Sequence, residues 1–89
     1  MTTTAKCFLF DGPHDGNKIE GTVDTDYDPF LPGMFEMHSP AFGDGVVYFY
    51  QQLGWKFVQE GKEIFVKAHY RCVGYRKNSN GRLTYNGEA

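Results

Sequence analysis

The sequence predicts a small, mainly β domain, and three observations support this. Aromatic residues make up 17% of the 89 residues, and Val is more common than Leu or Ile. Such residues suit a pleated, half-buried surface. Eleven Gly and four Pro interrupt the chain, as expected for short strands separated by turns. We therefore expect residues 1–89 to form a single domain: an antiparallel sheet of five or six strands, twisted or partly closed into an open barrel, with little helix.

The chain begins with a predicted hairpin. Residues 7–10 and 17–23 have strand-like composition, and the segment between them, 11–16, contains two Gly and a Pro. Gly supplies positive φ and Pro presets φ, so we expect this segment to turn. Residues 1–5 and 86–89 are expected to be frayed ends.

Residues 24–45 are predicted to form an acidic loop region that is rich in Pro and Gly, with one short strand at Met34–His38. The region contains Phe30, Phe35 and Phe42. We expect these three rings to hold it against the sheet, because leaving them in water would forgo the free energy of burial.

The clearest strand patterns lie in the second half of the chain. Residues 46–52 form a predicted strand, and residues 55–59 are expected to pair with a strand from Glu63 through a two-residue turn at Glu60–Gly61. Alternate residues of that second strand are expected to face the core, namely Ile64, Val66, Ala68, Tyr70 and Cys72. Asn80–Gly81 predicts a last turn, followed by a closing strand at residues 82–85.

Charge is divided along the chain. Residues 1–44 hold eight acids and two bases, whereas residues 45–89 hold three acids and seven bases. We interpret this division as complementarity between neighbouring strands, with steering of a charged partner as the alternative. The net charge of −2 argues against a general nucleic-acid binder, which carries a basic excess.

Two further features bear on the compartment. The sequence has no apolar run of about 18 residues and no apolar signal core near Met1, so we expect neither a transmembrane helix nor secretion. Cys7 and Cys72 are far apart and lack metal-ligand spacing. We expect both thiols to be reduced and buried, in a cytoplasmic protein.

No pattern in the sequence predicts catalysis, a cofactor or a metal site. Asp24, Asp26 and Asp28 begin like a calcium loop, but Pro29 and Phe35 stand where that loop requires Gly and Glu. The three histidines have no metal-ligand spacing, and no nucleophile elbow or phosphate-binding loop is present. We therefore expect a protein that is not an enzyme and holds no cofactor.

Two sets of residues are candidates for binding. In the acidic loop, charges would steer an encounter and a protein partner would bury the rings; the residues are Asp24, Asp26, Tyr27, Asp28 and Phe30. A second set is typical of sheets that stack single-stranded nucleic acid; it comprises Tyr48, Tyr50, Lys67, Arg71 and Arg76. Core packing is the competing interpretation of those tyrosines. Self-association as a homodimer through a strand edge is a further hypothesis.

Both ends of the chain resemble a known family. Residues 10–16 match an F-x-G-P-x-D-G opening, and residues 70–74 with 81–85 match a closing Y-x-x-x-G…G-R-x-x-Y. Small proteins encoded by bacteriophages of actinobacteria look like this, and many of them have Gly where this chain has Asp11. The resemblance implies a phage accessory protein made in the host cytoplasm, without catalytic residues.

The expected function is therefore binding to a host or phage protein. A nucleic-acid-associated β module and a virion decoration protein are the alternatives.

Overall fold

The computed structural model describes residues 1–41, 43, 45–77 and the backbone of residues 83–85. The strands are β1 (Thr2–Phe10), β2 (Lys18–Asp24), β3 (Met34–His38), β4 (Val46–Glu60), β5 (Glu63–Lys77) and β6 (Leu83–Tyr85). A single 3-10 turn, η1 (Gly12–His14), is the only helical element in this part of the chain. The predicted mainly β fold with little helix is confirmed. No helix among these residues is long and apolar enough to span a bilayer.

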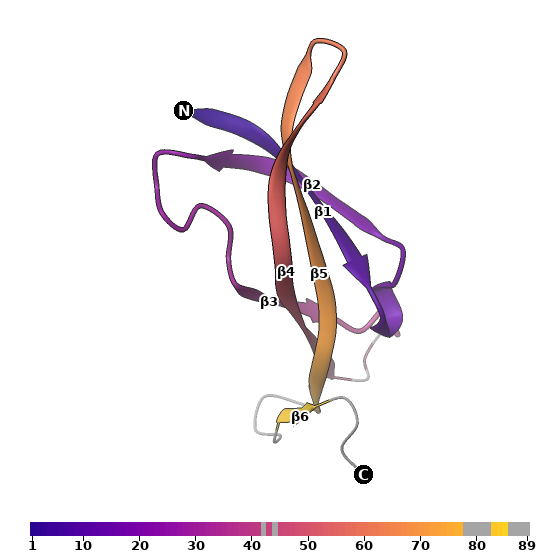
Figure 1. The fold of residues 1–89 in the computed structure, drawn as a ribbon. Coiled ribbons are helices and arrows are strands. Elements are labelled where there is room, and N and C mark those ends of the chain that lie inside the picture. Colours follow the sequence, from indigo (N-terminus) through magenta and orange to yellow (C-terminus); the bar gives the residue numbers. More distant parts are fainter. Residues whose placement is uncertain (42, 44, 78–82, 86–89) are drawn as a thin grey trace.

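All the strands belong to one sheet, in the order β2-β1-β5-β4-β3, with β6 paired to the end of β5 (Figure 1). The two ends of this order, β2 and β3, are not paired with each other, so the sheet is not closed into a barrel. Neighbouring strands are antiparallel except β1 and β5, which run parallel. The sequence did not predict the parallel pair, because strand composition does not reveal the direction of a neighbour distant in sequence.

β4 and β5 form a hairpin with 15 residues in each strand, and its turn projects beyond the other strands (Figure 1). The turn lies at residues 61–62, so the prediction of Glu60–Gly61 was wrong by one position. Gly61 has a φ of +60°. Gly at the first turn residue produces a type II′ turn, which matches the twist of the two strands.

One residue of the predicted core is exposed, because it lies at the projecting end of the hairpin. Ile64 was expected to be buried, but it lies opposite Gln59 beside the turn and 56% of it is exposed. The projecting end of the hairpin extends past the elements that would cover this side chain. The predicted alternation holds for the rest of β5, where Val66, Ala68 and Tyr70 are buried.

Two register shifts bend the β4–β5 hairpin. One leaves Val73 of β5 without an opposite residue, and the other does the same to Leu53 of β4. Such β-bulges increase the local twist of a strand pair, and the hairpin is visibly twisted in Figure 1. The bulge at Leu53 also joins the two predicted strands, 46–52 and 55–59, into the single strand β4.

One face of the sheet, here called the core face, carries the buried core. Register aligns Leu9 with Tyr70 and Tyr50 with Cys72, so these side chains point to the same side. The core cluster also includes a residue from the loop that crosses this face; its members are Ala5, Leu9, Leu31, Tyr50, Val66, Ala68, Tyr70 and Cys72.

The opposite face, here called the outer face, carries the alternate residues of the same strands. Lys6 lies beside Lys67, and Phe8 lies beside His69. Phe65 is buried on this face, and the Lys6 ammonium lies 4.0 Å from its ring centroid.

Two loops cover the core face, and each is tied to a buried tyrosine. The Tyr50 hydroxyl donates to the carbonyl oxygen of Asp11 at 2.9 Å and accepts from the backbone N–H of His14 at 3.2 Å. The Tyr70 hydroxyl donates to the carbonyl oxygen of Pro32 at 2.6 Å. The turn after β1 and the loop before β3 are therefore both anchored to the sheet.

The rings of Phe30 and Phe35 hold the acidic loop region against the sheet, as predicted. The Phe35 ring centroid lies 4.6 Å from that of Tyr70, and the Phe30 centroid lies 4.7 Å from that of Trp55. The third ring, Phe42, lies outside the described residues, as do the predicted turn at 78–81 and the tail at 86–89. The predicted closing strand is present as β6.

The predicted hairpin at the start of the chain is confirmed, but residues 2–5 are not frayed as expected. They belong to β1 and pair with residues 21–24 of β2, and Ala5 is buried. The polar composition of Thr2–Thr4 suggested a frayed end, yet Thr is β-branched and suits an exposed strand.

The turn after β1 is tightly packed. Asp11 and Gly12 both have positive φ, +64° and +66°. A Cβ added to Gly12 would lie 2.8 Å from the Cys72 Sγ and 2.9 Å from the Tyr50 hydroxyl oxygen. The Gly-Pro motif thus lets the backbone lie directly on the core.

We expect Gly12→Ala to lower the free energy of unfolding by about 2 kcal/mol, because the methyl group forces a strained backbone and displaces core atoms. Chemical denaturation followed by far-UV circular dichroism measures this. Gly21→Ala is the matched control, since nothing lies within 4 Å of its added Cβ. Equal effects of the two substitutions would contradict the interpretation.

Candidate functional site

The projecting end of the β4–β5 hairpin exposes three large apolar side chains in a row. Register places Phe57 opposite Val66 and Trp55 opposite Ala68, so both rings lie on the core face. Ile64, two residues before Val66, lies on the same face. We call Trp55, Phe57 and Ile64 the hairpin stripe; they are 43%, 54% and 56% exposed. The core face therefore continues past the packed core as an uncovered apolar surface.

The acidic loop lies beside this stripe, because Phe30 packs edge-on against Trp55. Phe30 is half-buried and packs against the core cluster, so it is mainly a structural contact. Tyr27 is different, since 70% of it is exposed. Of the two rings predicted for partner binding, Tyr27 is the one that is free to be buried by a partner.

The carboxylates of the loop are only partly available. The N-terminal ammonium of Met1 binds Asp24 at 2.8 Å and also binds Asp26. The hydrogen bond from this ammonium lowers the pKa of Asp24 below its ordinary value. Asp28 is exposed. The predicted partner-binding residues therefore lie on one loop, with Tyr27 and Asp28 as the members most accessible to a partner.

The predicted nucleic-acid residues do not form one surface. Tyr50 is fully buried, so it cannot stack on a base. Tyr48 shares the core face with Tyr50 and packs against the core cluster. Lys67 and Arg71 lie on the outer face, because they alternate with the buried residues Ala68 and Cys72. Core packing is therefore the correct interpretation of Tyr50.

The predicted cations have partners of their own. The Arg71 Nε lies 2.7 Å from the Asp11 carboxylate. Arg76 lies 3.9 Å from the Glu36 carboxylate and over the Phe49 ring. Both ion pairs join the basic half of the chain to the acidic half. Only the first joins β5 to the end of a neighbouring strand, β1, as the complementarity interpretation predicts; β3 and β5 are separated by β4.

The outer face carries an aromatic and basic set that shares only Lys67 with the predicted nucleic-acid residues. Lys56, Lys67 and Lys6 are directly opposite one another on β4, β5 and β1. Beside this lysine row, the His69 ring lies 6.0 Å from Phe8 and 5.5 Å from Phe10. In the sequence, the alternation of Lys6, Phe8 and Phe10 along β1 indicates that these three residues share a face.

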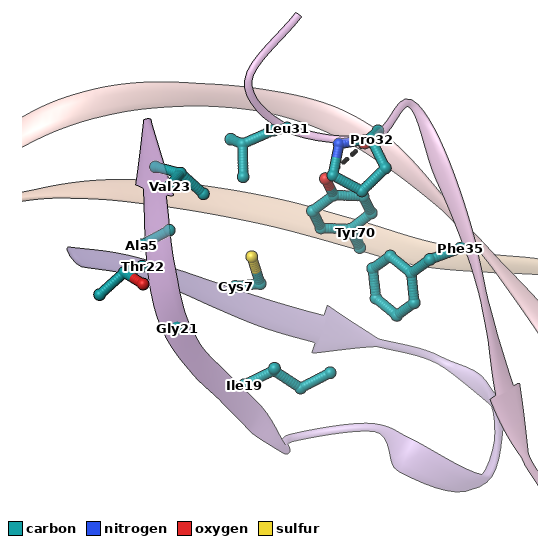
Figure 2. A pocket seen from close by; sticks show the side chains of 10 residues that line it. All are labelled: Ala5, Cys7, Ile19, Gly21, Thr22, Val23, Leu31, Pro32, Phe35 and Tyr70. Carbon is teal, nitrogen blue, oxygen red and sulfur yellow. Dashed lines mark hydrogen bonds between the residues drawn. The ribbon is translucent and has the colours of Figure 1, made fainter. Parts of the chain in front are cut away.

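An apolar pocket of about 220 Å³ lies between the β1–β2 hairpin and the loop before β3 (Figure 2). Cys7, Ile19 and Leu31 line it, and the rings of Phe35 and Tyr70 complete the wall. The Tyr70 hydroxyl is already bonded to Pro32, so the pocket lacks the converging polar groups that orient a ligand.

The cysteines are free, as predicted, but they differ in burial. Cys72 is buried, and Cys7 is half-buried in the wall of the pocket. Desolvation raises the pKa of the Cys7 thiol, so the thiolate that would act as a nucleophile is disfavoured. Within the described residues, no group of three or more His, Cys, Asp or Glu side chains could hold a metal ion.

Comparisons with protein-family models, curated proteins and solved structures found no match to this chain.

We expect Tyr70→Phe to lower the free energy of unfolding by about 1 kcal/mol, because it removes the hydrogen bond that the buried Tyr70 donates to the carbonyl of Pro32. Denaturant titration at neutral pH measures the loss. Tyr27→Phe removes the hydroxyl of an exposed ring and should leave stability unchanged. A loss of equal size in both variants would contradict the anchoring role of Tyr70.

Stability should also fall at alkaline pH. Desolvation raises the pKa of Tyr70 above its ordinary value of 10.0. The folded chain therefore retains a proton that the unfolded chain releases, and this stabilisation is complete below about pH 10 and is lost as pH rises. Tyr70→Phe should show a shallower decline above pH 10 than the unmodified protein. An identical slope would show that Tyr70 ionises normally.

Proposed function

We propose that this chain is a non-enzymatic interaction protein that binds another protein through the hairpin stripe and through Tyr27, on the loop whose Phe30 packs against the stripe. The observation that carries the proposal is the exposure of Trp55, Phe57 and Ile64 on one face of a projecting hairpin. Burial of one such side chain contributes about 1.5–3 kcal/mol. A partner that covers all three would therefore gain much of its affinity there, as aromatic anchors do in protein interfaces.

The loop beside the stripe supplies charge and a further ring. Asp28 is exposed next to Tyr27, and such rim carboxylates increase the association rate with a basic surface. Tyr is also one of the residues most enriched at the centre of interfaces. These features favour a partner with an apolar groove bordered by basic residues.

The origin and compartment of the protein are part of the same proposal. The motifs at residues 10–16 and 70–85 resemble small phage proteins, which supports an accessory protein made in an actinobacterial host. The free thiols of Cys7 and Cys72 are consistent with the reducing cytoplasm of such a cell. The proposed partner is then a host or phage protein in that cytoplasm.

Affinity capture from host lysate tests the proposed surface. We expect Phe57→Ser with Ile64→Ser to reduce the amount of captured partner about tenfold or more. Both side chains are more than half exposed, so the melting temperature should remain near that of the unmodified protein.

Met34→Ser is the matched control, because Met34 is also an exposed apolar residue but lies on β3, opposite Gln51. This variant should capture the partner normally. Undiminished capture by the double variant would show that the contact lies elsewhere on the chain.

A second candidate function is binding to single-stranded nucleic acid through the outer face. The lysine row of Lys56, Lys67 and Lys6 favours it, since lysines side by side attract a phosphate backbone. The Lys6 ammonium also binds Glu63 at 2.8 Å, so Lys56 and Lys67 supply most of the attraction. The neighbouring rings of Phe8, Phe10 and His69 would supply the stacking platform.

This candidate predicts a strong dependence on salt. Single-stranded DNA should bind at low ionic strength, and the affinity should fall steeply as salt rises. Lys67→Gln with Arg71→Gln should weaken binding to all sequences alike, whereas Lys62→Gln, in the hairpin turn, should not. Absence of binding at low salt, measured by fluorescence anisotropy, would eliminate this candidate.

A further inference from the structure

The edge of β4 is open along the projecting half of the hairpin. β3 pairs with β4 only between Val47 and Gln51. Beyond this point, Gly54–Glu60 pairs with β5 on one side, and no described strand pairs with it on the other. Alternate backbone N–H and C=O groups along that side are therefore available to another strand.

Like charges face each other across the hairpin beside this edge. Lys56 is directly opposite Lys67, and Glu60 is directly opposite Glu63. Directly opposed like charges destabilise a strand pair. The Lys6 ammonium binds Glu63 at 2.8 Å and offsets part of the second repulsion, whereas Lys56 and Glu60 form no ion pair with the described residues. Lys56 and Glu60 are both exposed, and both lie on the outer face because they alternate with Phe57 and Gln59 along β4. An opposite charge placed along the open edge of β4 would therefore stabilise both Lys56 and Glu60.

We propose that a second copy of this chain pairs with the open edge, β4 to β4 and antiparallel, around a two-fold axis at Val58. In this register Val58 lies opposite Val58 of the second copy. Lys56 of each copy then lies opposite Glu60 of the other, which forms two symmetric ion pairs. Every unfavourable charge at the hairpin edge gains an opposite neighbour from the second copy.

Neighbouring two-fold registers do not produce this match. An axis at Phe57 places Lys56 opposite Val58 and leaves Glu60 opposite Gly54. An axis at Lys56 places two lysines opposite each other, and an axis at Gln59 places Lys56 opposite Lys62. The sequence along this edge is therefore self-complementary in charge only around Val58.

The same register also brings the apolar side chains together on the core face. Phe57 lies opposite Gln59 of the second copy, so the two Phe57 rings become diagonal neighbours across the new strand pair. Diagonal neighbours are about 7–8 Å apart, which is within reach of aromatic rings. The hairpin stripes of the two copies then form one continuous apolar surface. This inference goes beyond the proposed function and does not rest on it, because its charged residues lie outside the partner-binding surface.

Sedimentation analysis over a range of concentrations tests the proposal. We expect the unmodified protein to dimerise, and we expect Lys56→Glu or Glu60→Lys alone to raise the dissociation constant about tenfold or more, because each places like charges opposite each other. The double variant, Lys56→Glu with Glu60→Lys, restores the opposite charges and should recover the dimer. Lys77→Glu is the control; it makes the same charge change at the far end of β5 and should leave the dissociation constant unchanged.

Hydrogen exchange provides a second measurement that does not depend on a variant. Amides within residues 54–60 should become more protected as the concentration of the unmodified protein rises. A protein that remains monomeric at millimolar concentration would overturn the proposal. Dimerisation that both single variants leave intact, or that the double variant fails to restore, would overturn it equally.

Discussion

The hydroxyl groups of two fully buried tyrosines determine how this chain encloses a core. A buried hydroxyl without a hydrogen bond is costly, so Tyr50 and Tyr70 each require a polar partner inside the protein. The backbone of two loops supplies these partners, at Asp11 and His14 for Tyr50 and at Pro32 for Tyr70. A single open sheet has no second layer to cover its apolar face. Here the two anchored loops take the place of that layer.

The sequence predicted the strands well because their signals are local. Alternation of apolar residues identified β5, and the Gly-Pro-rich segments identified the turns. The sequence did not predict features that depend on pairing across the sheet. The turn at residues 61–62 and the unpaired Leu53 and Val73 arise from register, which is set by twist and packing together. The parallel alignment of β1 with β5 has no local signal at all.

The candidate site was predictable in part for the same reason. Composition identified the acidic loop and its aromatic residues. Tyr27 of this loop is exposed, as a binding residue must be. The tyrosines of β4 were ambiguous, because a ring in a strand suits a core and a stacking surface equally. Only the register shows that Tyr50 shares a face with Cys72 while Arg71 points away. Lys67 was predicted as a candidate, but its alignment with Lys6 and Lys56 was not, because these residues are far apart in sequence and become neighbours through strand order.

The parallel pairing of β1 with β5 has a consequence for how the chain folds during synthesis. β1 is synthesised about 60 residues before its parallel neighbour β5, as the Arg71–Asp11 contact illustrates. Closing so long a loop costs conformational entropy before any contact offsets it, and such non-local pairing is slow. The side of β1 that will join β5 therefore remains unpaired in the β1–β2 hairpin until β5 has been made. During that interval its apolar face, with Ala5, Cys7 and Leu9, is available to chaperones and to other nascent chains.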